Sequence, residues 1–468
     1  MSESHYGAIV IGAGPGGYPC AIRLGQLGVR TLIVEQQWWG GVCLNVGCIP
    51  SKALITAAKK FEEISHAKLY GFQVPGPVLI DATVLQKWKG EVVGKLTGGV
   101  KTLLKANKVD SLEGKARIVA EKTIVVATAG GEKRFTADSI VIATGSSPIE
   151  VPGFAFSDSP AVLDSTGALA LDRVPERLVV IGGGYIGLEM SGVYAKLGCK
   201  VTVVEMMDQL LPGFDPDVVK VVDRRIKKDG ATILLKTKAI GWEQAEKGIV
   251  VEVETPKGRE KLPADHVLVT VGRRPNSKNL GIEALGVVMD GAFIKVDRQL
   301  RTNIRWLYAI GDVAGNPMLA HKATHDGEVA AEVIHGRNVT WDAKTVPAVV
   351  FTDPEIATAG LTEPECKRQG LDIKVGKVPF AAIGRAIANN ESDGFVKVII
   401  DAKSHLVLGV TIVGYHASDI ISEAALAIEM GAEALDIGLT IHPHPTLGEG
   451  VMEAAKAALG EAIHVVNK

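Results

Sequence analysis

The chain has 468 residues, with 51 Lys and Arg against 53 Asp and Glu, a formal net charge of −2, and a hydrophobic fraction of 47%. This near balance of charge excludes a strongly basic nucleic-acid-binding protein, and the length is enough for roughly three domains. No window of eighteen uninterrupted apolar residues occurs, so we expect neither a transmembrane helix nor a membrane partner.

The cysteine content and the N-terminal sequence bear on the compartment. Five Cys in a chain of this length are too few for a disulfide scaffold, and the odd number indicates a reducing environment. Residues 1–10 run directly into an apolar strand pattern and show no leader pattern. We therefore expect a cytoplasmic chain, or a mature organellar matrix chain whose leader has been removed.

An internal repeat occupies the first half of the chain. In each copy a strand pattern (6–11, then 178–181) runs into a glycine-rich turn and a helical pattern, and a second strand pattern (31–34, then 201–204) ends in a Glu. The first Gly precedes that Glu by 23 residues in both copies, from 12 to 35 and from 182 to 205. The marked residues are Gly12, Gly14, Gly17 and Glu35 in the first copy, and Gly182, Gly184, Gly187 and Glu205 in the second.

These residue types are the ones that dinucleotide binding requires. The first Gly allows the tight turn, the second lets backbone approach a pyrophosphate, and the third lets the helix pack closely on the strand. The helix N-terminus offers free N–H groups to the phosphates, and the Glu accepts hydrogen bonds from ribose hydroxyls. One such turn is weak evidence, because a glycine-rich loop without a ligand is the alternative. Two copies with identical spacing predict two bound dinucleotides.

The remaining elements follow in chain order. Buried strand patterns at 139–145, 266–272 and 306–312 run into Thr144-Gly145, Gly272 and Asp312. A helix is predicted over 320–335. Further on, paired strands are predicted at 395–400 and 406–412, and a helix at 418–430 with Ser418 or Asp419 as its N-cap. The pattern predicts an α/β fold with two Rossmann-like dinucleotide-binding domains and a C-terminal α+β domain.

Two cysteines, Cys43 and Cys48, follow the first Glu and are separated by four residues. In an ideal helix, Cα atoms five residues apart are about 8–9 Å from each other, whereas a disulfide tolerates at most about 7 Å. A bonded pair therefore requires a distorted helix start, and Gly47 and Pro50 are suited to that. A redox disulfide, two buried thiols and a zinc site are the three interpretations, and the zinc site lacks a second Cys/His cluster.

The sequence from Cys43 to Lys52, placed between two dinucleotide motifs, resembles the pyridine nucleotide-disulphide oxidoreductase family, class I. The stretches 318–323, 351–355 and 441–449 support the resemblance, which covers nearly the whole chain. It implies an FAD-binding domain at 1–150, an NAD-binding domain at 151–275, a second part of the FAD-binding or central domain at 276–345, and a dimerisation (interface) domain at 346–468.

The resemblance also implies roles for individual residues. Cys43 and Cys48 would form the redox-active disulfide, with Cys48 facing the flavin, and His444 with Glu449 would handle the proton. The residues implied for FAD are Gly12, Gly14, Gly17, Glu35, Lys52, Gly114, Thr144, Gly145, Asp312 and Ala320. Those implied for NAD are Gly182, Gly184, Gly187, Glu189, Glu205, Ala239 and Gly272, and no metal is expected.

The activity that the resemblance implies is oxidation of protein-bound dihydrolipoamide to lipoamide, with reduction of NAD through the disulfide and FAD. It further implies a homodimer in which His444 reaches the disulfide of the other subunit. The partners would be the lipoyl domains or acyltransferase core of 2-oxoacid dehydrogenase complexes, or a glycine cleavage carrier protein. Two alternatives are another FAD-dependent disulfide reductase of the same architecture and a non-catalytic flavoprotein that serves as a binding component.

Single residues predict the nucleotide preference and several local environments. A carboxylate at Glu205 would repel a 2′-phosphate by about 4 kcal/mol at 4 Å and an effective dielectric near 20, which predicts NAD rather than NADP. Ordinary packing is expected for Cys20, Cys199 and Cys366, and structural roles are expected for His321 and His325. The run 227–229 is expected to be a solvated helix end.

Overall fold

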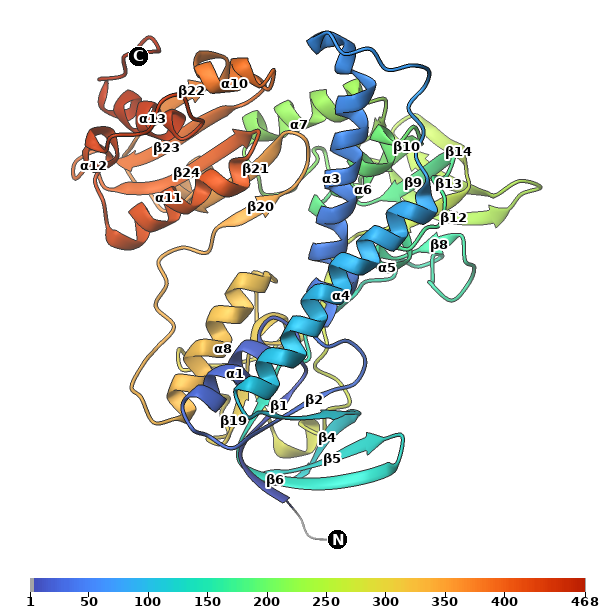
Figure 1. Ribbon diagram of the computed structural model, residues 1–468, viewed down its shortest axis with the longest axis vertical. Coiled ribbons are helices and arrows are strands. Elements are labelled where there is room, and N and C mark those ends of the chain that lie inside the picture. Colours follow the sequence, from blue (N-terminus) through green and yellow to red (C-terminus); the bar gives the residue numbers. More distant parts are fainter. Residues whose placement is uncertain (1–3, 468) are drawn as a thin grey trace.

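The structure is a computed structural model, and it describes residues 4–467. Three packed domains each contain one main sheet (Figure 1). A two-stranded ribbon joins the first two domains. The N-terminal domain holds a 7-stranded sheet in the order β3-β2-β1-β6-β5-β4, with β19 paired to β6. Its strands are β1 (Ser4–Ile11), β2 (Thr31–Glu35), β3 (Asp110–Glu113), β4 (Lys115–Ala120), β5 (Thr123–Thr128), β6 (Gly131–Ile142) and β19 (Leu307–Ala309).

Continuous apolar runs explain the parallel centre of this sheet. Strand β1 pairs in parallel with β2 and β6, and most of its residues are buried, because one face of the strand packs against helices and the other against β4 and β5. The helical segments of this domain are α1 (Gly17–Gln26), α2 (Gly41–Val46), α3 (Cys48–Ser65), η1 (Ala67–Tyr70), α4 (Ala82–Ala106), η3 (Gly311–Val313) and α8 (Ala320–Ile334). The predicted strands at 6–11 and 31–34 and the predicted helix at 320–335 are confirmed.

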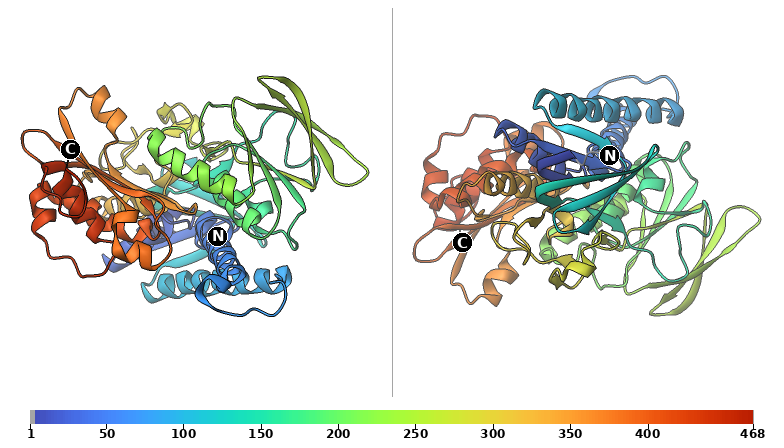
Figure 2. Two further views of the ribbon diagram at one scale, coloured as in Figure 1. Left: turned by 90° about the horizontal axis from the view of Figure 1, so that it is seen from above. Right: turned by 90° about the horizontal axis from the view of Figure 1, so that it is seen from below.

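The middle domain repeats the arrangement with a 5-stranded parallel sheet in the order β11-β10-β9-β15-β8. An antiparallel sheet of three strands projects from its outer edge (Figure 2). The main strands are β8 (Val162–Leu163), β9 (Arg177–Ile181), β10 (Lys200–Val204), β11 (Thr232–Leu234) and β15 (His266–Val269); the outer ones are β12 (Lys238–Gln244), β13 (Ile249–Thr255) and β14 (Gly258–Ala264). The helices are α5 (Ser165–Leu169), α6 (Tyr185–Lys196) and α7 (Pro216–Lys228).

Short elements connect the two dinucleotide-type domains. Strand β7 (Ser146–Pro148) pairs with β16 (Arg273–Pro275), so the chain leaves and re-enters the N-terminal domain along one ribbon. Past this ribbon lie η2 (Glu283–Leu285) and the small pair β17 (Met289–Asp290) and β18 (Phe293–Ile294).

The C-terminal domain is a 5-stranded antiparallel sheet in the order β20-β21-β24-β23-β22. The strands are β20 (Ala348–Val350), β21 (Glu355–Gly360), β22 (Ile373–Pro379), β23 (Phe395–Asp401) and β24 (Val407–Gly414), which confirms the strand pair predicted at 395–412. Its helical segments are α9 (Glu363–Arg368), η4 (Phe380–Ala382), α10 (Gly384–Ala388), α11 (Ala417–Met430), α12 (Ala434–Leu439) and α13 (Glu449–Leu459).

Two local expectations are wrong. Helix α11 has His416 as its N-cap, at a φ of +57°, and not Ser418 or Asp419, because the chain turns into the helix directly after β24. Asp229 is not part of a solvated helix end, because its side chain is 10% exposed and pairs with Arg225 and Lys196. Only the lysines of the run 227–229 are exposed.

One helical stretch of the described chain, from Gly41 to Ser65, is long and apolar enough to cross a membrane by length and composition. From the sequence we expected no such helix. Core helices of proteins outside membranes pass the same test, and α3 packs against α4 and α6 in the middle of the molecule (Figure 1). It also carries Lys52, Lys59 and Glu62, which form ion pairs with other parts of the chain. These contacts make α3 a helix of the fold.

Candidate active site

The two glycine turns share one backbone geometry. Gly12 and Gly182 start the turns with φ values of +104° and +107°, in the left-handed region that favours glycine. A Cβ at Gly17 would lie 1.9 Å from the carbonyl oxygen of Gly12, and a Cβ at Gly187 would lie 2.2 Å from that of Gly182. Helices α1 and α6 therefore begin tightly against their turns. Nothing lies within 4 Å of a Cβ placed at Gly184, so that backbone stays open to a ligand.

The two predicted ribose acceptors, Glu35 and Glu205, are each 8% exposed and lie at equivalent places. The Ala13 N–H donates to Glu35 Oε2 at 2.7 Å, and the Gly183 N–H donates to Glu205 Oε2 at 2.6 Å. Each carboxylate thus ties the end of its strand to its glycine turn. These backbone bonds are a further role for the two acids that the sequence pattern did not reveal.

A cavity of about 490 Å³ opens at the carboxyl ends of β1, β2 and β6, the position where open parallel sheets bind ligands. It combines the glycine turn before α1 with the cysteine helix, so its residues fit a flavin dinucleotide. Gly17 packs beneath the turn instead of lining the wall. The predicted residues on the wall are Gly12, Gly14, Glu35, Cys43, Cys48, Lys52, Gly114, Thr144, Gly145, Glu189, Asp312 and Ala320.

The other residues predicted for NAD lie in the middle domain, outside this cavity. Gly182, Gly184 and Gly187 form the second turn. Ala239 is buried in strand β12 and packs in the cluster that includes the end of β10, while Gly272 follows β15 at a φ of +128°. Glu189 of α6 is the predicted NAD residue that reaches the first cavity, which places it at the junction of the two predicted sites.

The helix that carries the cysteines is broken between them. Helix α2 ends at Val46, Gly47 has φ −140° and ψ −111°, and α3 begins at Cys48. A Cβ at Gly47 would lie 3.0 Å from the carbonyl oxygen of Val42 and 3.4 Å from the Cα of Cys43. The distortion that a bonded pair requires is therefore present at Gly47. Both cysteines are thiols in the structure.

The two thiols are not equivalent. Cys48 is accessible at the cavity wall, whereas Cys43 is partly covered. The hydrogen bond from the Cys43 thiol lowers the pKa of Cys48 to about 7, against the opposing effect of burial, and the Lys52 ammonium lowers it further. The same hydrogen bond and burial raise the pKa of Cys43. Cys48 is therefore the thiolate of the pair and Cys43 the hydrogen-bond donor.

Lys52 lies one turn after Cys48 on α3 and has two partners. Its Nζ is 2.8 Å from Glu189 Oε2, and it lies 4.1 Å from the centre of the Phe351 ring. Glu189 is 5% exposed, and its other oxygen accepts the Phe351 N–H at 3.0 Å. Sequence reasoning noted Phe351 only as part of a family stretch and missed this contact, because its aromatic side chain belongs to a distant domain.

Asp312 accepts a hydrogen bond from Ser146 Oγ at 2.6 Å, and the Arg273 Nε donates to the same hydroxyl at 2.8 Å. Ser146 and Arg273 both line the cavity and were missed from the sequence. Both residues directly follow a strand pattern that was predicted to end at the site, and this position could have marked them as site residues. Thr144 Oγ1 donates to the carbonyl oxygen of Asn276 at 2.8 Å, which joins the segment before β7 to the segment after β16.

The predicted proton-handling pair lies in the C-terminal domain. His444 Nδ1 is 2.8 Å from Glu449 Oε1, and the Thr446 N–H donates to the other oxygen at 2.8 Å. Burial raises the pKa of Glu449, but the bonds from Thr446 and His444 outweigh it and hold this pKa below its usual value. The His444 side chain is 76% exposed and does not line the cavity of its own chain.

The neighbouring His442 has a different environment. Its side chain is 6% exposed and its Nε2 lies 2.8 Å from Glu423 Oε1. Glu423, on α11, gave no sequence signal because the two residues are brought together only by the fold. His442 is therefore a packed histidine, and the exposed imidazole of the two belongs to His444.

The remaining residues mostly match their expected roles. Cys20, Cys199 and Cys366 are buried in the packing of the fold, as predicted. His321 Nε2 lies 2.7 Å from the Pro347 carbonyl oxygen, and His325 packs edge-on against Trp341. Between residues 4 and 467, no group of three or more His, Cys, Asp or Glu side chains is arranged to hold a metal ion.

Comparison with known proteins identifies the class. Residues 6–327 match the family model described as pyridine nucleotide-disulphide oxidoreductase, and residues 346–455 match the dimerisation domain of the same family. The chain therefore belongs to the pyridine nucleotide-disulphide oxidoreductase family. Its fold class and its character as an FAD- and NAD-dependent disulfide oxidoreductase, both predicted from the sequence, are confirmed, and the dimerisation domain supports the predicted homodimer.

Individual relatives and solved structures are similar to this chain over nearly its whole length. The chain is 48% identical to a dihydrolipoyl dehydrogenase of Geobacillus stearothermophilus and 50% identical to that of Bacillus subtilis, in both cases over 98% of this chain and 97% of the relative. Among solved structures, LpdA from Mycobacterium tuberculosis has a TM-score of 0.89 at 27% identity, covering 96% of this chain and 99% of that one. The flavoprotein disulfide reductase RclA from Escherichia coli has a TM-score of 0.87 at 28% identity, covering 97% and 99%.

Proposed function

We propose that the protein oxidises dihydrolipoyl groups to lipoyl groups and reduces NAD⁺, as the names of its relatives indicate for those proteins. The observation that carries the proposal is the asymmetric cysteine pair, with a thiolate at Cys48 and a donor at Cys43, on the wall of a dinucleotide cavity. FAD, when bound there, supplies a two-electron acceptor that passes a hydride to NAD⁺. The identities near 50% favour this substrate over that of another disulfide reductase.

In the proposed reaction the oxidised enzyme holds a Cys43–Cys48 disulfide. A substrate thiol gives its proton to His444, and the resulting thiolate attacks the Sγ of Cys43, which breaks the Cys43–Cys48 bond and releases Cys48 as a thiolate. The second substrate thiol then attacks the first substrate sulfur, which breaks its bond to Cys43 and closes the cyclic disulfide of the product. The proton of the second thiol passes to the released Cys43 sulfur. The protein dithiol has then gained the two electrons that the substrate lost.

The proton in this step depends on His444 and Glu449. A substrate thiol with a pKa near 8.5 is only about 3% thiolate at pH 7, so a base increases the reactive fraction. Glu449, ionised at that pH, holds the His444 ring through Nδ1 and leaves Nε2 to accept the proton. Because His444 is exposed and lies outside its own chain's cavity, we propose that it serves the cysteine pair of the other subunit of the dimer.

Glu205 favours NAD over NADP at the second turn. Its carboxylate is 8% exposed and bonded to the Gly183 N–H, so it stays in place to accept a ribose 2′-hydroxyl and to repel a 2′-phosphate. At 4 Å and an effective dielectric near 20, that repulsion is about 4 kcal/mol. The proposed partners are the lipoyl domains of 2-oxoacid dehydrogenase complexes or a glycine cleavage carrier protein, and the proposed location is the cytoplasm.

The experiment that tests the function compares wild type with Cys43→Ser in a lipoamide–NADH assay. Wild type is expected to turn over dihydrolipoamide with NAD⁺, and the variant is expected to lose this activity because the sulfur that the substrate attacks is absent. The matched control is Cys366→Ser, a buried thiol that has no role in the reaction. Full lipoamide activity in Cys43→Ser, or none in wild type, would contradict the proposal.

A further inference from the structure

A turn of the C-terminal domain reaches between the helices that carry the redox residues. Residues 351–354 connect β20 to β21. The Phe351 ring lies against Lys52 of α3, and the Phe351 N–H donates to Glu189 of α6. Two residues on, Asp353 contacts the same two helices at a second place, so one short turn touches both helices twice.

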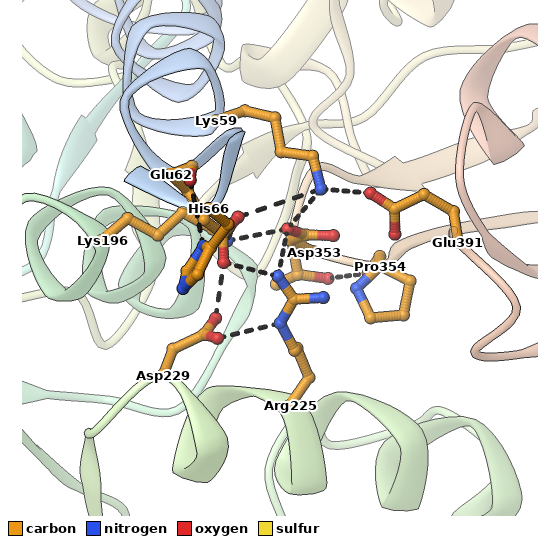
Figure 3. Close-up of polar contacts among 10 residues, drawn as sticks. Lys59, Glu62, His66, Lys196, Arg225, Asp229, Asp353, Pro354 and Glu391 are labelled. Carbon is orange, nitrogen blue, oxygen red and sulfur yellow. Dashed lines mark hydrogen bonds and ion pairs between the residues drawn. The ribbon is translucent and has the colours of Figure 1, made fainter. Parts of the chain in front are cut away.

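The second contact is a cluster of charges with little exposure. Asp353 Oδ2 lies 3.1 Å from Lys59 Nζ, 2.8 Å from Lys196 Nζ and 3.0 Å from Arg225 Nη2. The three cations, which come from α3, α6 and α7, all point toward Asp353 (Figure 3). The cluster is completed by Glu62, Asp229 and Glu391, and its side chains are 6–21% exposed.

The spacing along the helices relates the two contacts. On α3 the contacted residues are Lys52 and Lys59, and on α6 they are Glu189 and Lys196. Both pairs are seven residues apart, close to two helical turns, so each pair lies on one face at a separation of about 10 Å along the axis. Residues 351–354 therefore contact one face of α3 and one face of α6 at two points each. These contacts fix the position of α3 along the axis of α6.

We propose that Phe351 and Asp353 are positioning residues, which hold α3 in register with α6 and thereby keep the Lys52 ammonium beside the Cys48 sulfur. The inference rests on the redox role proposed for Cys48. It assigns the C-terminal domain an influence on the thiolate within its own subunit, in addition to the part that His444 is proposed to play in the other subunit. The charged and titratable groups that face Cys48 are Cys43 from α2, Lys52 from α3, and Glu189 and Tyr185 from α6.

The electrostatics of the two contacts support the inference. Lys52 lowers the pKa of Cys48 and Glu189 raises it, so the balance depends on where the ammonium lies between them. Burial would raise the pKa of Asp353, but Lys196, Lys59 and Arg225 lower it to about 2. Asp353 therefore stays charged at neutral pH and keeps the three cations together.

The test follows the long-wavelength thiolate–flavin absorbance of the holoenzyme, reduced with dithiothreitol, as a function of pH. In Phe351→Leu the backbone bond to Glu189 remains but the ring is lost, so Lys52 moves away from Cys48 and the midpoint of the absorbance rises by about 0.5 to 1 pH unit. Phe351→Tyr keeps a ring under Lys52 and is expected to stay within about 0.3 of wild type. Asp353→Asn is also expected to raise the pH midpoint of the absorbance.

Asp215→Asn is the matched control for a general loss of stability. Asp215 is 4% exposed and pairs with Lys397 of the C-terminal domain at 2.6 Å, so its loss also breaks a buried contact between domains, but at the other end of α7. Its thermal midpoint is expected to fall while its absorbance midpoint stays at the wild-type pH. An unchanged absorbance midpoint in Phe351→Leu, or an equal rise of the absorbance midpoint in Asp215→Asn, overturns the inference while the proposed function stands. If reduced wild type shows no long-wavelength absorbance at any pH, both the inference and the proposed function are overturned. This result is distinguishable from an unchanged midpoint, in which the absorbance is present.

Discussion

At the scale of single residues, the chemistry depends on the different environments of two cysteines. Cys48 accepts the hydrogen bond that Cys43 donates, which lowers the pKa of Cys48 and raises that of Cys43, while Lys52 favours the thiolate of both. One sulfur is therefore a thiolate near neutral pH and the other is protonated. This division of roles matches a reaction in which one sulfur meets the substrate and the other meets the flavin. Spacing in the sequence indicated a reactive pair, but the assignment to each sulfur came from the resemblance, because proximity to Lys52 is a property of the fold.

The lowered pKa of Cys48 predicts a particular pH dependence of thiol modification. In the reduced, flavin-free protein, alkylation of Cys48 by iodoacetamide is expected to rise with pH and reach half its maximal rate near pH 7, because the thiolate is the nucleophile. Peptide mass spectrometry over a range of pH measures the rate. Cys20 is an internal control, because burial raises its pKa to about 12. A midpoint for Cys48 near 8.5, the value of an ordinary thiol, would contradict the assignment.

At the scale of elements, the break between α2 and α3 is the feature that brings the cysteines together. An unbroken helix would hold them about 8–9 Å apart at the Cα atoms, beyond the reach of a disulfide. Gly47 leaves room for the chain to fold back against Val42 and Cys43. Sequence reasoning anticipated a distortion at Gly47 and Pro50. It did not anticipate the turn 351–354, because residues from a domain 300 positions away give no local pattern near Cys48.

Gly47→Ala is predicted to impair the cysteine pair. Its Cβ would lie 3.0 Å from the Val42 carbonyl oxygen, so the backbone around Cys43 must shift. Overpacking of this kind typically costs about 1–3 kcal/mol, and we expect a lower thermal midpoint together with a slower reoxidation of the dithiol. Gly192→Ala on α6, where a new Cβ meets nothing within 4 Å, is the control and is expected to be neutral or slightly stabilising. Equal behaviour of the two variants would show that the close approach at Gly47 is unimportant.

At the scale of the whole molecule, two dinucleotide-type domains and one antiparallel domain meet around α3. The sequence predicted this architecture well, because buried parallel strands and glycine turns are local patterns with fixed spacing. The domain boundaries at 150, 275 and 345 stay predictions. The sequence could not predict the contacts between domains, such as the ion-pair cluster around Asp353, because those pairs join residues from five separate stretches of the chain.

The proposed sharing of His444 between subunits predicts complementation in mixed dimers. Cys43→Ser and His444→Gln homodimers are each expected to lose about a hundredfold or more of lipoamide activity. A heterodimer of the two, isolated with different affinity tags, has one site with an intact Cys43 from one chain and an intact His444 from the other, and is expected to recover about half of the wild-type activity. A heterodimer as inactive as its parents would place His444 in its own chain's site instead.

The central claim is that the Cys48 sulfur contacts the flavin while the substrate reacts at Cys43, and an absorption spectrum of the purified holoenzyme variants tests it most directly. Cys43→Ser leaves a free Cys48 thiolate, so we expect a flavin band with a long-wavelength shoulder even without reductant. Cys48→Ser is expected to keep the flavin band and never to show the shoulder. A shoulder that survives in Cys48→Ser, or a wild-type protein that takes up no flavin, would contradict the account.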